Sequence, residues 1–323
     1  MPIFAVNKQI LTPISEIEFD LERDIQKLTE ANLQTIFGLT FISGALNQEF
    51  SIPTQDQEFY IDTLAFDEAS RAFVIIEYKK DKSFSIIDQG FAYLSAMLNH
   101  KANFVLELNE RLQKSYRIGD IDWEQSRVIF ISPSFTNYQK NAINFKDLPI
   151  FLYEVHLYSN NIIEYDSIKP YKTTQSIQSL TKDKIIREVS KEVKVYSVDD
   201  LIKPEWTNTK SLLEEFEKQL LSSESETKVK YTKFYIAYMS KHGRNYVEIV
   251  PQKQGLKVYY RFPAGQVKSE LKIGDCSKIG HWTNGESFIY LNNASQIPEA
   301  LRLTKESFAY LHKDIYGKKK QRI

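Results

Sequence analysis

Cysteine is almost missing from this chain of 323 residues, which contains only Cys276. A single cysteine excludes a disulfide framework and any zinc site built mainly from cysteine ligands. Glycine and proline are also scarce, with 11 and 10 residues, and this excludes collagen-like and low-complexity architectures. The remaining composition is that of a globular protein, long enough for about two domains of roughly 150 residues.

Long apolar runs and targeting signals are missing as well. The segment Leu33 to Gln48 carries no charge but includes Gln, Thr, Ser and Asn, so it is too polar to cross a membrane. The residues up to Ile14 include one lysine and no small-residue cleavage site, unlike a secretory signal. We therefore expect a cytoplasmic protein without membrane partners.

The formal net charge of zero hides a strong asymmetry between the two halves. Residues 1–165 contain 14 basic and 23 acidic side chains, whereas residues 166–323 contain 28 basic and 19 acidic ones. Clustered carboxylates suit a metal site or a solvated face, and a basic excess suits contact with phosphate groups. Attraction between the two halves is the alternative explanation.

Hydrophobic periodicity predicts alternating helices and strands in residues 1–165, and hence an α/β class. Ser15 is a plausible N-cap for the first predicted helix, and a short polar link at 67–71 predicts a hairpin. The predicted helices cover 16–30 and 86–99, and the predicted strands cover 60–66, 73–79, 104–108, 128–132 and 150–157.

The second half predicts a separate, smaller α+β domain. Residues 166–195 are polar and sparse in apolar side chains, which predicts a linker with one short helix near Ile185. A domain over 196–323 follows, and the basic tail Lys318 to Arg322 is either a solvated end or a DNA-binding arm. The helices predicted in this domain cover 211–221 and 297–311, and the strands cover 231–239, 246–250 and 256–262.

Two carboxylates and a lysine on neighbouring predicted strands suggest a metal-binding site. Asp62 and Glu77 would supply oxygen ligands to a hard divalent cation, with the backbone carbonyl of Tyr78 as a third ligand. Lys79 lies two residues after Glu77, on the same side of its strand, where an ammonium could orient water or stabilise charge on phosphorus. The alternative is that Glu77 and Lys79 form a solvated strand end and that Asp62 is a carboxylate beside a turn.

The surroundings of this pair resemble a known family. Glu22 borders the buried face of the first predicted helix, and Gln89 and Tyr93, four residues apart, share a face of the helix after Lys79. Together with Ile61-Asp62-Thr63-Leu64 and Ile75-Ile76-Glu77-Tyr78-Lys79, they resemble the PD-(D/E)XK restriction-endonuclease-like superfamily, in its branch with a Gln-x-x-x-Tyr motif. The resemblance covers residues 14 to 165 and implies a central mixed sheet flanked by helices.

The resemblance also implies roles for the matching residues. Asp62, Glu77 and Glu22 would be metal ligands, with Glu18 and Glu49 as weaker candidates for the part of Glu22. Lys79 would orient water or stabilise charge, and Gln89 and Tyr93 would support the site or contact the nucleic-acid backbone. Relatives often carry Arg where this chain has Tyr60, so one contact to a phosphate or carboxylate group is lost here.

Four short segments characterise the C-terminal half: Phe234–Tyr238, Val247–Pro251, Leu256–Tyr259 and Ile279–Trp282. Together they resemble an uncharacterised small α/β domain found fused to such nuclease-like modules. Aromatic residues with lysines on its strands could stack bases and contact phosphates, although such residues also form cores.

The resemblance implies a metal-dependent nuclease that uses Mg²⁺ or Mn²⁺ and acts on DNA in bacterial defence or repair. A homodimer is a further hypothesis from the resemblance. A catalytically inactive binding module with the same fold is the main alternative, since a fold does not guarantee a function. An RNA-directed nuclease would share the chemistry. The five histidines are dispersed, with no metal-ligand spacing, and no P-loop glycine pattern is present.

Overall fold

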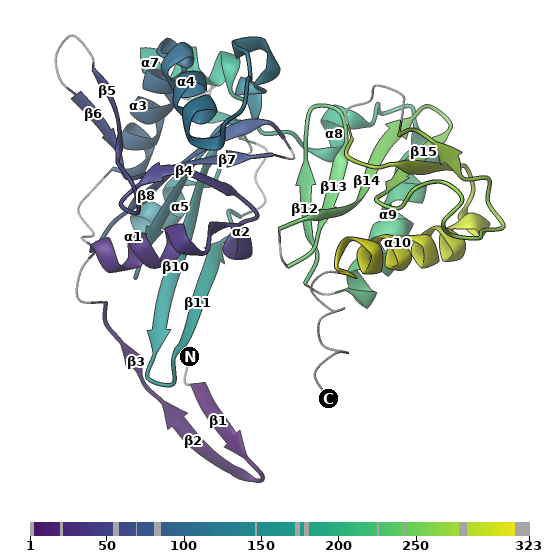
Figure 1. Ribbon diagram of the computed structural model, residues 1–323, viewed down its shortest axis with the longest axis horizontal. Helices are drawn as coiled ribbons and strands as arrows, with labels where there is room; N and C mark the ends of the chain where they lie inside the picture. Colours follow the sequence, from purple (N-terminus) through teal and green to yellow (C-terminus); the bar gives the residue numbers. More distant parts are fainter. Residues whose placement is uncertain are drawn as a thin grey trace. The chain divides into compact units, whose positions relative to one another are not determined.

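The computed structural model describes residues 3–19, 22–53, 58–68, 70–80, 85–145, 147–171, 175–177, 181–224, 226–241, 243–277 and 283–313. It divides the chain into two units, Met1–Val195 and Tyr196–Ile323, each with its own sheet and core (Figure 1). The predicted features at 279–282 and at the basic tail, residues 318–322, lie outside the described residues. None of the helices described is long and apolar enough to cross a bilayer.

A seven-stranded mixed sheet forms the centre of the first unit. Its order is β11-β10-β9-β8-β7-β4, with β3 paired to β10. The three central strands β8, β9 and β10 are parallel, and the flanking pairs are antiparallel. The strands are β3 (Glu16–Ile17), β4 (Thr40–Gly44), β7 (Thr63–Asp67), β8 (Ala72–Tyr78), β9 (Arg127–Ser132), β10 (Ile150–Tyr158) and β11 (Ile162–Ile168).

Helices cover both faces of this sheet. On one face α1 (Glu22–Ala31) and α2 (Leu33–Ile36) pack against Val74 and Ile76 of β8. On the other, Phe73 and Ile75 of β8 contact a core that includes α3 (Ile86–Asn99), α4 (Lys101–Leu112) and α7 (Lys184–Glu192). Every residue of β8 is buried because helices lie on both sides of the strand. The predicted fold class, a mixed sheet flanked by helices, is confirmed.

Smaller elements complete the first unit. Two hairpins lie outside the central sheet, each as a two-stranded sheet of its own. They are formed by β1 (Ile3–Asn7) with β2 (Ile10–Ile14), and by β5 (Phe50–Pro53) with β6 (Glu58–Ile61). Short helices are α5 (Asn137–Ala142), η1 (Ile118–Asp120) and η2 (Trp123–Gln125).

The segment that carries the predicted chemistry folds largely as expected. β7 and β8 form an antiparallel hairpin, and α3 starts after Ser85, whose side chain accepts a hydrogen bond from the backbone N–H of Asp88. The strand predicted at 60–66, however, is interrupted at Asp62. Since β6 pairs with β5 while β7 pairs with β4 and β8, the chain bends at Asp62 to pass from one sheet to the other.

Two elements predicted in the first unit differ from the structure. The helix predicted at 16–30 begins only at Glu22, and Ser15 is not its cap, because Ile17 belongs to β3 and pairs with Leu157. The strand predicted at 104–108 is instead the middle of α4. Phe104 and Leu108 lie one helical turn apart and both face the core, so the apolar run fits a helix.

Residues 166–195 belong to the first unit and are not the predicted linker. β11 extends to Ile168 and continues the central sheet. The short helix predicted near Ile185 is α7, whose Ile186 and Val189 join the core formed with α3. Few apolar residues are present in this segment, but Ile177, Ile186, Val189 and Val193 are buried.

The second unit is a six-stranded antiparallel sheet with two long helices packed in one core. The single strand predicted at 231–239 is two strands, β12 and β13, and the other predicted elements are present. The elements are α8 (Val198–Leu201), α9 (Thr207–Ser223), β12 (Lys228–Tyr231), β13 (Ile236–Met239), β14 (Asn245–Gln252), β15 (Gly255–Tyr260), β16 (Gly274–Asp275), β17 (Ser287–Leu291), η3 (Ala294–Gln296) and α10 (Ile297–Leu311). Cys276 is buried in this unit.

Candidate active site

Glu77 lies at the centre of the candidate site, near the carboxyl end of β8. Its side chain is only 3% exposed, yet three donors surround it. Lys79 Nζ lies 2.7 Å and Gln89 Nε2 2.8 Å from Oε1, and the Tyr93 hydroxyl donates to Oε2 over 2.8 Å. A buried carboxylate is tolerated when charged and polar donors compensate for lost hydration, and these three do so.

Helix α3 brings two of these donors to the strand. Gln89 and Tyr93 lie one turn apart, and Gln89 Nε2 also approaches the Tyr93 hydroxyl at 3.3 Å. Burial, and then the charge of Glu77, raise the pKa of the Tyr93 hydroxyl well above its ordinary value. Tyr93 therefore stays protonated and acts as a hydrogen-bond donor to Glu77.

Asp62 lies beside this cluster, at the bend between β6 and β7. Its Oδ2 accepts a hydrogen bond from the backbone N–H of Tyr78 at 3.0 Å, which ties the bend to the end of β8. Burial, and then the charge of Glu77, raise the pKa of Asp62 from 3.8 to about 7, although the Tyr78 N–H and Lys79 oppose the shift. A carboxylate whose proton affinity is raised by a neighbouring carboxylate marks a site where added positive charge is favourable.

Lys79 supplies positive charge between the two acids. Burial lowers its pKa, but the hydrogen bond and charge of Glu77, with the charge of Asp62, outweigh burial and raise it overall. The lysine is therefore an ammonium ion at neutral pH. Its backbone N–H donates to the carbonyl of Ile131 in β9, so the chain beyond the end of β8 remains tied to the sheet.

The structure places the other predicted residues around this centre. Glu22, at the start of α1, accepts a hydrogen bond from the backbone N–H of Lys80 at 2.8 Å, and its charge contributes to the raised pKa of Asp62. The Tyr78 side chain points to the opposite face of the sheet, near Thr63. Glu18 and Glu49 are exposed, and neither takes part in the hydrogen bonds described for this site.

A buried polar network on α1 makes hydrogen bonds to the chain at Asp62 and Thr63, and it was not predicted. Gln26 Nε2 donates to the backbone carbonyl of Asp62 at 2.6 Å and to Glu30 Oε1 at 3.0 Å. Glu30, 3% exposed, also accepts from the Thr63 hydroxyl at 2.6 Å and from the backbone N–H of Leu46 at 2.9 Å. Gln26 and Glu30 therefore fix the bend at Asp62. Their spacing of four residues on one helix face was the available signal.

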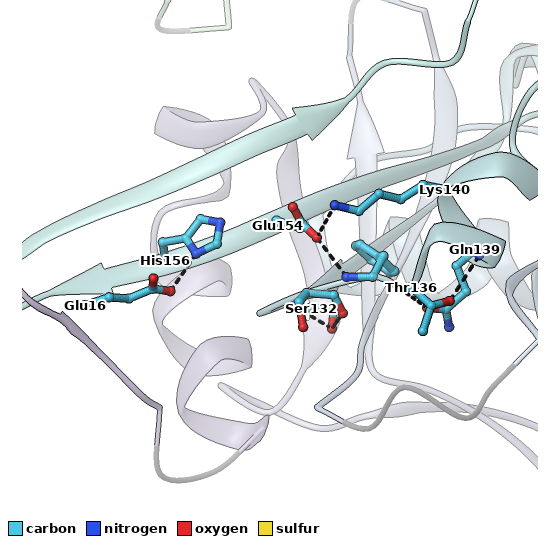
Figure 2. A network of polar contacts seen from close by, with 9 residues as sticks. Glu16, Ser132, Thr136, Gln139, Lys140, Glu154 and His156 are labelled. Carbon is cyan, nitrogen blue, oxygen red and sulfur yellow. Dashed lines mark hydrogen bonds and ion pairs between the residues drawn. The ribbon is translucent and has the colours of Figure 1, made fainter. Parts of the chain in front are cut away.

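A second polar cluster lies at the carboxyl ends of the adjacent parallel strands (Figure 2). Glu154 of β10 pairs in register with Ser132, the last residue of β9. Its Oε1 accepts from Lys140 Nζ of α5 and from the backbone N–H of Phe135, each at 2.8 Å. Ligands of α/β sheets commonly bind at this edge, so Lys140 provides a second cation on the edge where Glu77 lies.

The side chains fit a divalent cation in chemistry, but they do not form a completed metal cage. An ionised carboxylate has about four acceptor sites, and the donors described here occupy three on Glu77. Oxygen donors from Asp62 and Glu77 are the type that Mg²⁺ or Mn²⁺ prefers. Among the described residues, no three acidic, histidine or cysteine side chains are grouped as a metal site.

Comparisons with known proteins place the chain among relatives. No family model matches it. A crystal structure of a repair endonuclease from Pyrococcus abyssi aligns with 40% of this chain and 45% of its own, at 19% identity and a TM-score of 0.19. An uncharacterised protein of Haemophilus influenzae is 37% identical over 311 residues, which cover 95% of this chain and 99% of the relative. The chain therefore belongs to the same family as this Haemophilus influenzae protein.

Proposed function

We propose that the first unit is a divalent-metal-dependent DNA endonuclease, a phosphodiester hydrolase of the cytoplasm that acts in bacterial defence or repair. The observation that carries the proposal is the buried Glu77 carboxylate, held by Lys79, Gln89 and Tyr93 beside an Asp62 of raised pKa. Perturbed titratable groups next to a charge partner are typical of reactive sites. The same residues are the ones that resemble the motif of the PD-(D/E)XK superfamily.

Each side chain has a distinct part in the proposed reaction. Asp62, Glu77 and Glu22, with the carbonyl of Tyr78, would hold Mg²⁺ or Mn²⁺, which supplies an activated water and polarises the phosphoryl group. Lys79 would donate to the phosphate oxygen as negative charge develops there. Gln89 and Tyr93 would keep Glu77 in one orientation, and Lys140 would contact a neighbouring phosphate.

The test is cleavage of single- and double-stranded DNA with Mg²⁺ or Mn²⁺ by wild type, Glu77→Gln and Lys79→Met. We expect each variant to lose at least about 10²-fold in rate, the effect of removing an electrostatic stabiliser from an active site. Glu110→Gln, on the exposed side of α4, is the matched control and should cleave like wild type. Circular dichroism verifies that the variants are folded.

Cleavage that is unchanged in Glu77→Gln, or that persists in EDTA, would contradict this mechanism. Parallel assays on RNA separate a DNA-directed from an RNA-directed enzyme, since both would use the same side chains.

A catalytically inactive binding module is the second candidate, and one observation favours it. Lys79 is paired with Glu77 at 2.7 Å, so this lysine already neutralises the carboxylate that a metal would use. Metal titration followed by calorimetry distinguishes the two. A cation bound by wild type and lost in Asp62→Asn supports the enzyme, whereas no binding together with no cleavage supports the binding module.

We also propose that the second unit contacts nucleic acid through the face formed by β15 and β17. Lys257 Nζ lies 3.8 Å from the ring centre of Phe288 and 5.6 Å from that of Tyr290. Tyr290 is 47% exposed, unlike Tyr238 and Tyr260, which are core residues. An exposed ring beside a lysine suits base stacking with a phosphate contact.

Fluorescence anisotropy with single-stranded DNA tests this role. Tyr290→Ala should weaken binding by roughly 5- to 150-fold, which corresponds to the ~1–3 kcal/mol of one stacked base. Tyr138→Ala removes a ring that is 83% exposed in the first unit and should leave affinity unchanged. Equal affinities of wild type and Tyr290→Ala would exclude this face.

A further inference from the structure

The β5–β6 hairpin leads directly into Asp62 and lies beside α3 (Figure 1). Ile61, on its inner side, is 1% exposed and belongs to the core that includes α3. The ring of Phe59 lies 6.3 Å from the ring of Tyr93, which donates its hydroxyl hydrogen bond to Glu77. These contacts fix the position of the hairpin relative to the candidate site.

The outer side of the hairpin presents an exposed ring in a defined orientation. Tyr60, between Phe59 and Ile61, faces the opposite way and is 57% exposed. Its hydroxyl donates to Glu58 Oε2 at 2.7 Å, and the Ser51 hydroxyl donates to Oε1 of the same carboxylate at 2.5 Å. A ring that is oriented before binding loses little conformational freedom when a ligand stacks on it.

The chemistry of this outer side suits a nucleobase better than a phosphate group. No lysine or arginine occurs from Phe50 to Ile61. Hydrogen bonds from Ser51 and then from Tyr60 lower the pKa of Glu58, so this carboxylate is ionised at neutral pH and repels phosphate oxygens. The uncharged face of the Tyr60 ring can instead stack on any base, and a carboxylate beside it can accept from the amino group of a base.

Tyr60 is also close to the position that a scissile phosphate would take. Two residues of an extended chain span about 7 Å, and side chains two residues apart lie on the same side of the chain. Under the proposed function, Asp62 holds the metal ion that contacts this phosphate. A base attached to the phosphate would then lie within reach of the Tyr60 ring.

We propose that Tyr60 stacks on an unpaired base beside the scissile phosphate, and that the substrate is nucleic acid with unpaired nucleotides at the cleavage point. In a continuous duplex the neighbouring pairs cover both faces of every base, so the ring would have no face to contact. A single strand, or the junction of a single with a double strand, presents such a face. This inference rests on the proposed nuclease function and deepens it by naming the substrate class.

Cleavage of one labelled strand in three contexts tests the substrate class with the full-length protein. With Mg²⁺ or Mn²⁺, wild type should cut the strand faster when it is single or part of a splayed junction than when it is in a continuous duplex. Tyr60→Ala should lower kcat/KM on the unpaired substrates by roughly 5- to 150-fold, the effect of losing one stacked base. Tyr60→Phe keeps the ring and should lose much less.

The matched control is Tyr171→Ala, which should cut all three substrates like wild type. The Tyr171 ring is 77% exposed and follows β11, the edge strand three positions from β8. Because the Tyr60 ring is exposed as well, its removal leaves core packing unchanged. Tyr60→Ala that cuts the unpaired substrates as fast as wild type, or a wild type that prefers the continuous duplex, overturns the inference and leaves the nuclease function intact.

A binding measurement without cleavage separates this inference from the proposed function. Single-stranded DNA carrying 2-aminopurine, a base whose fluorescence changes on stacking, at each position in turn is titrated with Glu77→Gln and with the double variant Glu77→Gln/Tyr60→Ala. The fluorescence change should be smaller in the double variant at one or two positions. The same result without cleavage by wild type contradicts the nuclease function and supports the base contact, whereas equal changes at every position overturn the contact.

Discussion

The hydroxyl of Tyr93 shows how one side chain can hold a candidate site together. It donates to Glu77 from a ring that is almost fully buried, 6% exposed. Its partner oxygen belongs to a carboxylate that has little access to water. The hydrogen bond therefore replaces hydration, and its loss leaves a charge under-solvated.

We predict that Tyr93→Phe lowers the free energy of unfolding of the first unit by about 1–3 kcal/mol, the cost of leaving a buried acceptor without its donor. The ring is retained, so packing is unchanged. Urea denaturation measures the effect. Tyr138→Phe is the control, because the Tyr138 side chain on α5 is exposed. Equal stability of Tyr93→Phe and wild type would mean that Glu77 does not depend on this donor.

The sequence was sufficient to predict most of the residues that gather at Glu77. Lys79 follows it on the same chain segment, and Gln89 and Tyr93 lie on the next helix, so short-range patterns determine their proximity. Gln26 and Glu30 were missed because polar residues on a helix usually mark its solvated face. Here they are buried by partners distant in the sequence, which periodicity does not reveal.

At the scale of elements, α3 is the helix that positions the site against the sheet. Its Gly90 lets the helix approach β9 and β10 closely. A Cβ atom added there would lie 2.5 Å from Ile150 Cδ1 and 3.5 Å from Phe130 Cε2. A larger residue would therefore force the Ile150 side chain to move or push α3, with Gln89 beside it, away from the sheet.

We expect Gly90→Ala to destabilise the first unit by roughly 1–3 kcal/mol through overpacking, although alanine favours helix formation. Gly119→Ala is the matched control, because a Cβ at Gly119 would meet no atom within 4 Å. Thermal unfolding of both variants measures the difference. If Gly90→Ala were as stable as Gly119→Ala, the close approach of α3 would be absent in solution.

Elements with strong local signals were predicted well, and those defined by distant pairing were not. Helix α3 was predicted with its bounds because its apolar residues recur at helical spacing. Strand β3 was missed because only its pairing with β10 defines it. Helix α4 was mistaken for a strand because a five-residue apolar window fits both periods.

At the scale of the whole molecule, the chain contains two separate sets of core residues. The clusters of the first unit end at Val193, and the cluster of the second begins at Ile202. Residues that pack in one core unfold together, so we expect each unit to unfold in a separate cooperative transition.

We predict two transitions in calorimetry, each shifted by a different change. Mn²⁺ should raise only the transition temperature of the first unit, because a cation bound to the native state stabilises it, and Asp62→Asn should abolish that shift. Phe216→Ala, in the core of the second unit, should lower only the transition temperature of the second unit, because it reduces the free energy of unfolding by about 3–5 kcal/mol. A single transition that responds to both changes would show that the units unfold together.

The single cysteine, Cys276, is a natural probe of local opening in the second unit. Cys276 is buried, and burial raises the pKa of its thiol to about 11, so the native protein presents almost no thiolate to an alkylating reagent at neutral pH. Modification then requires the surrounding strands to separate first. The labelling rate, divided by that of the unfolded chain, gives the free energy of this opening without an engineered probe. Full labelling that occurs well before global unfolding would identify the region around β16 as the weakest part of its sheet.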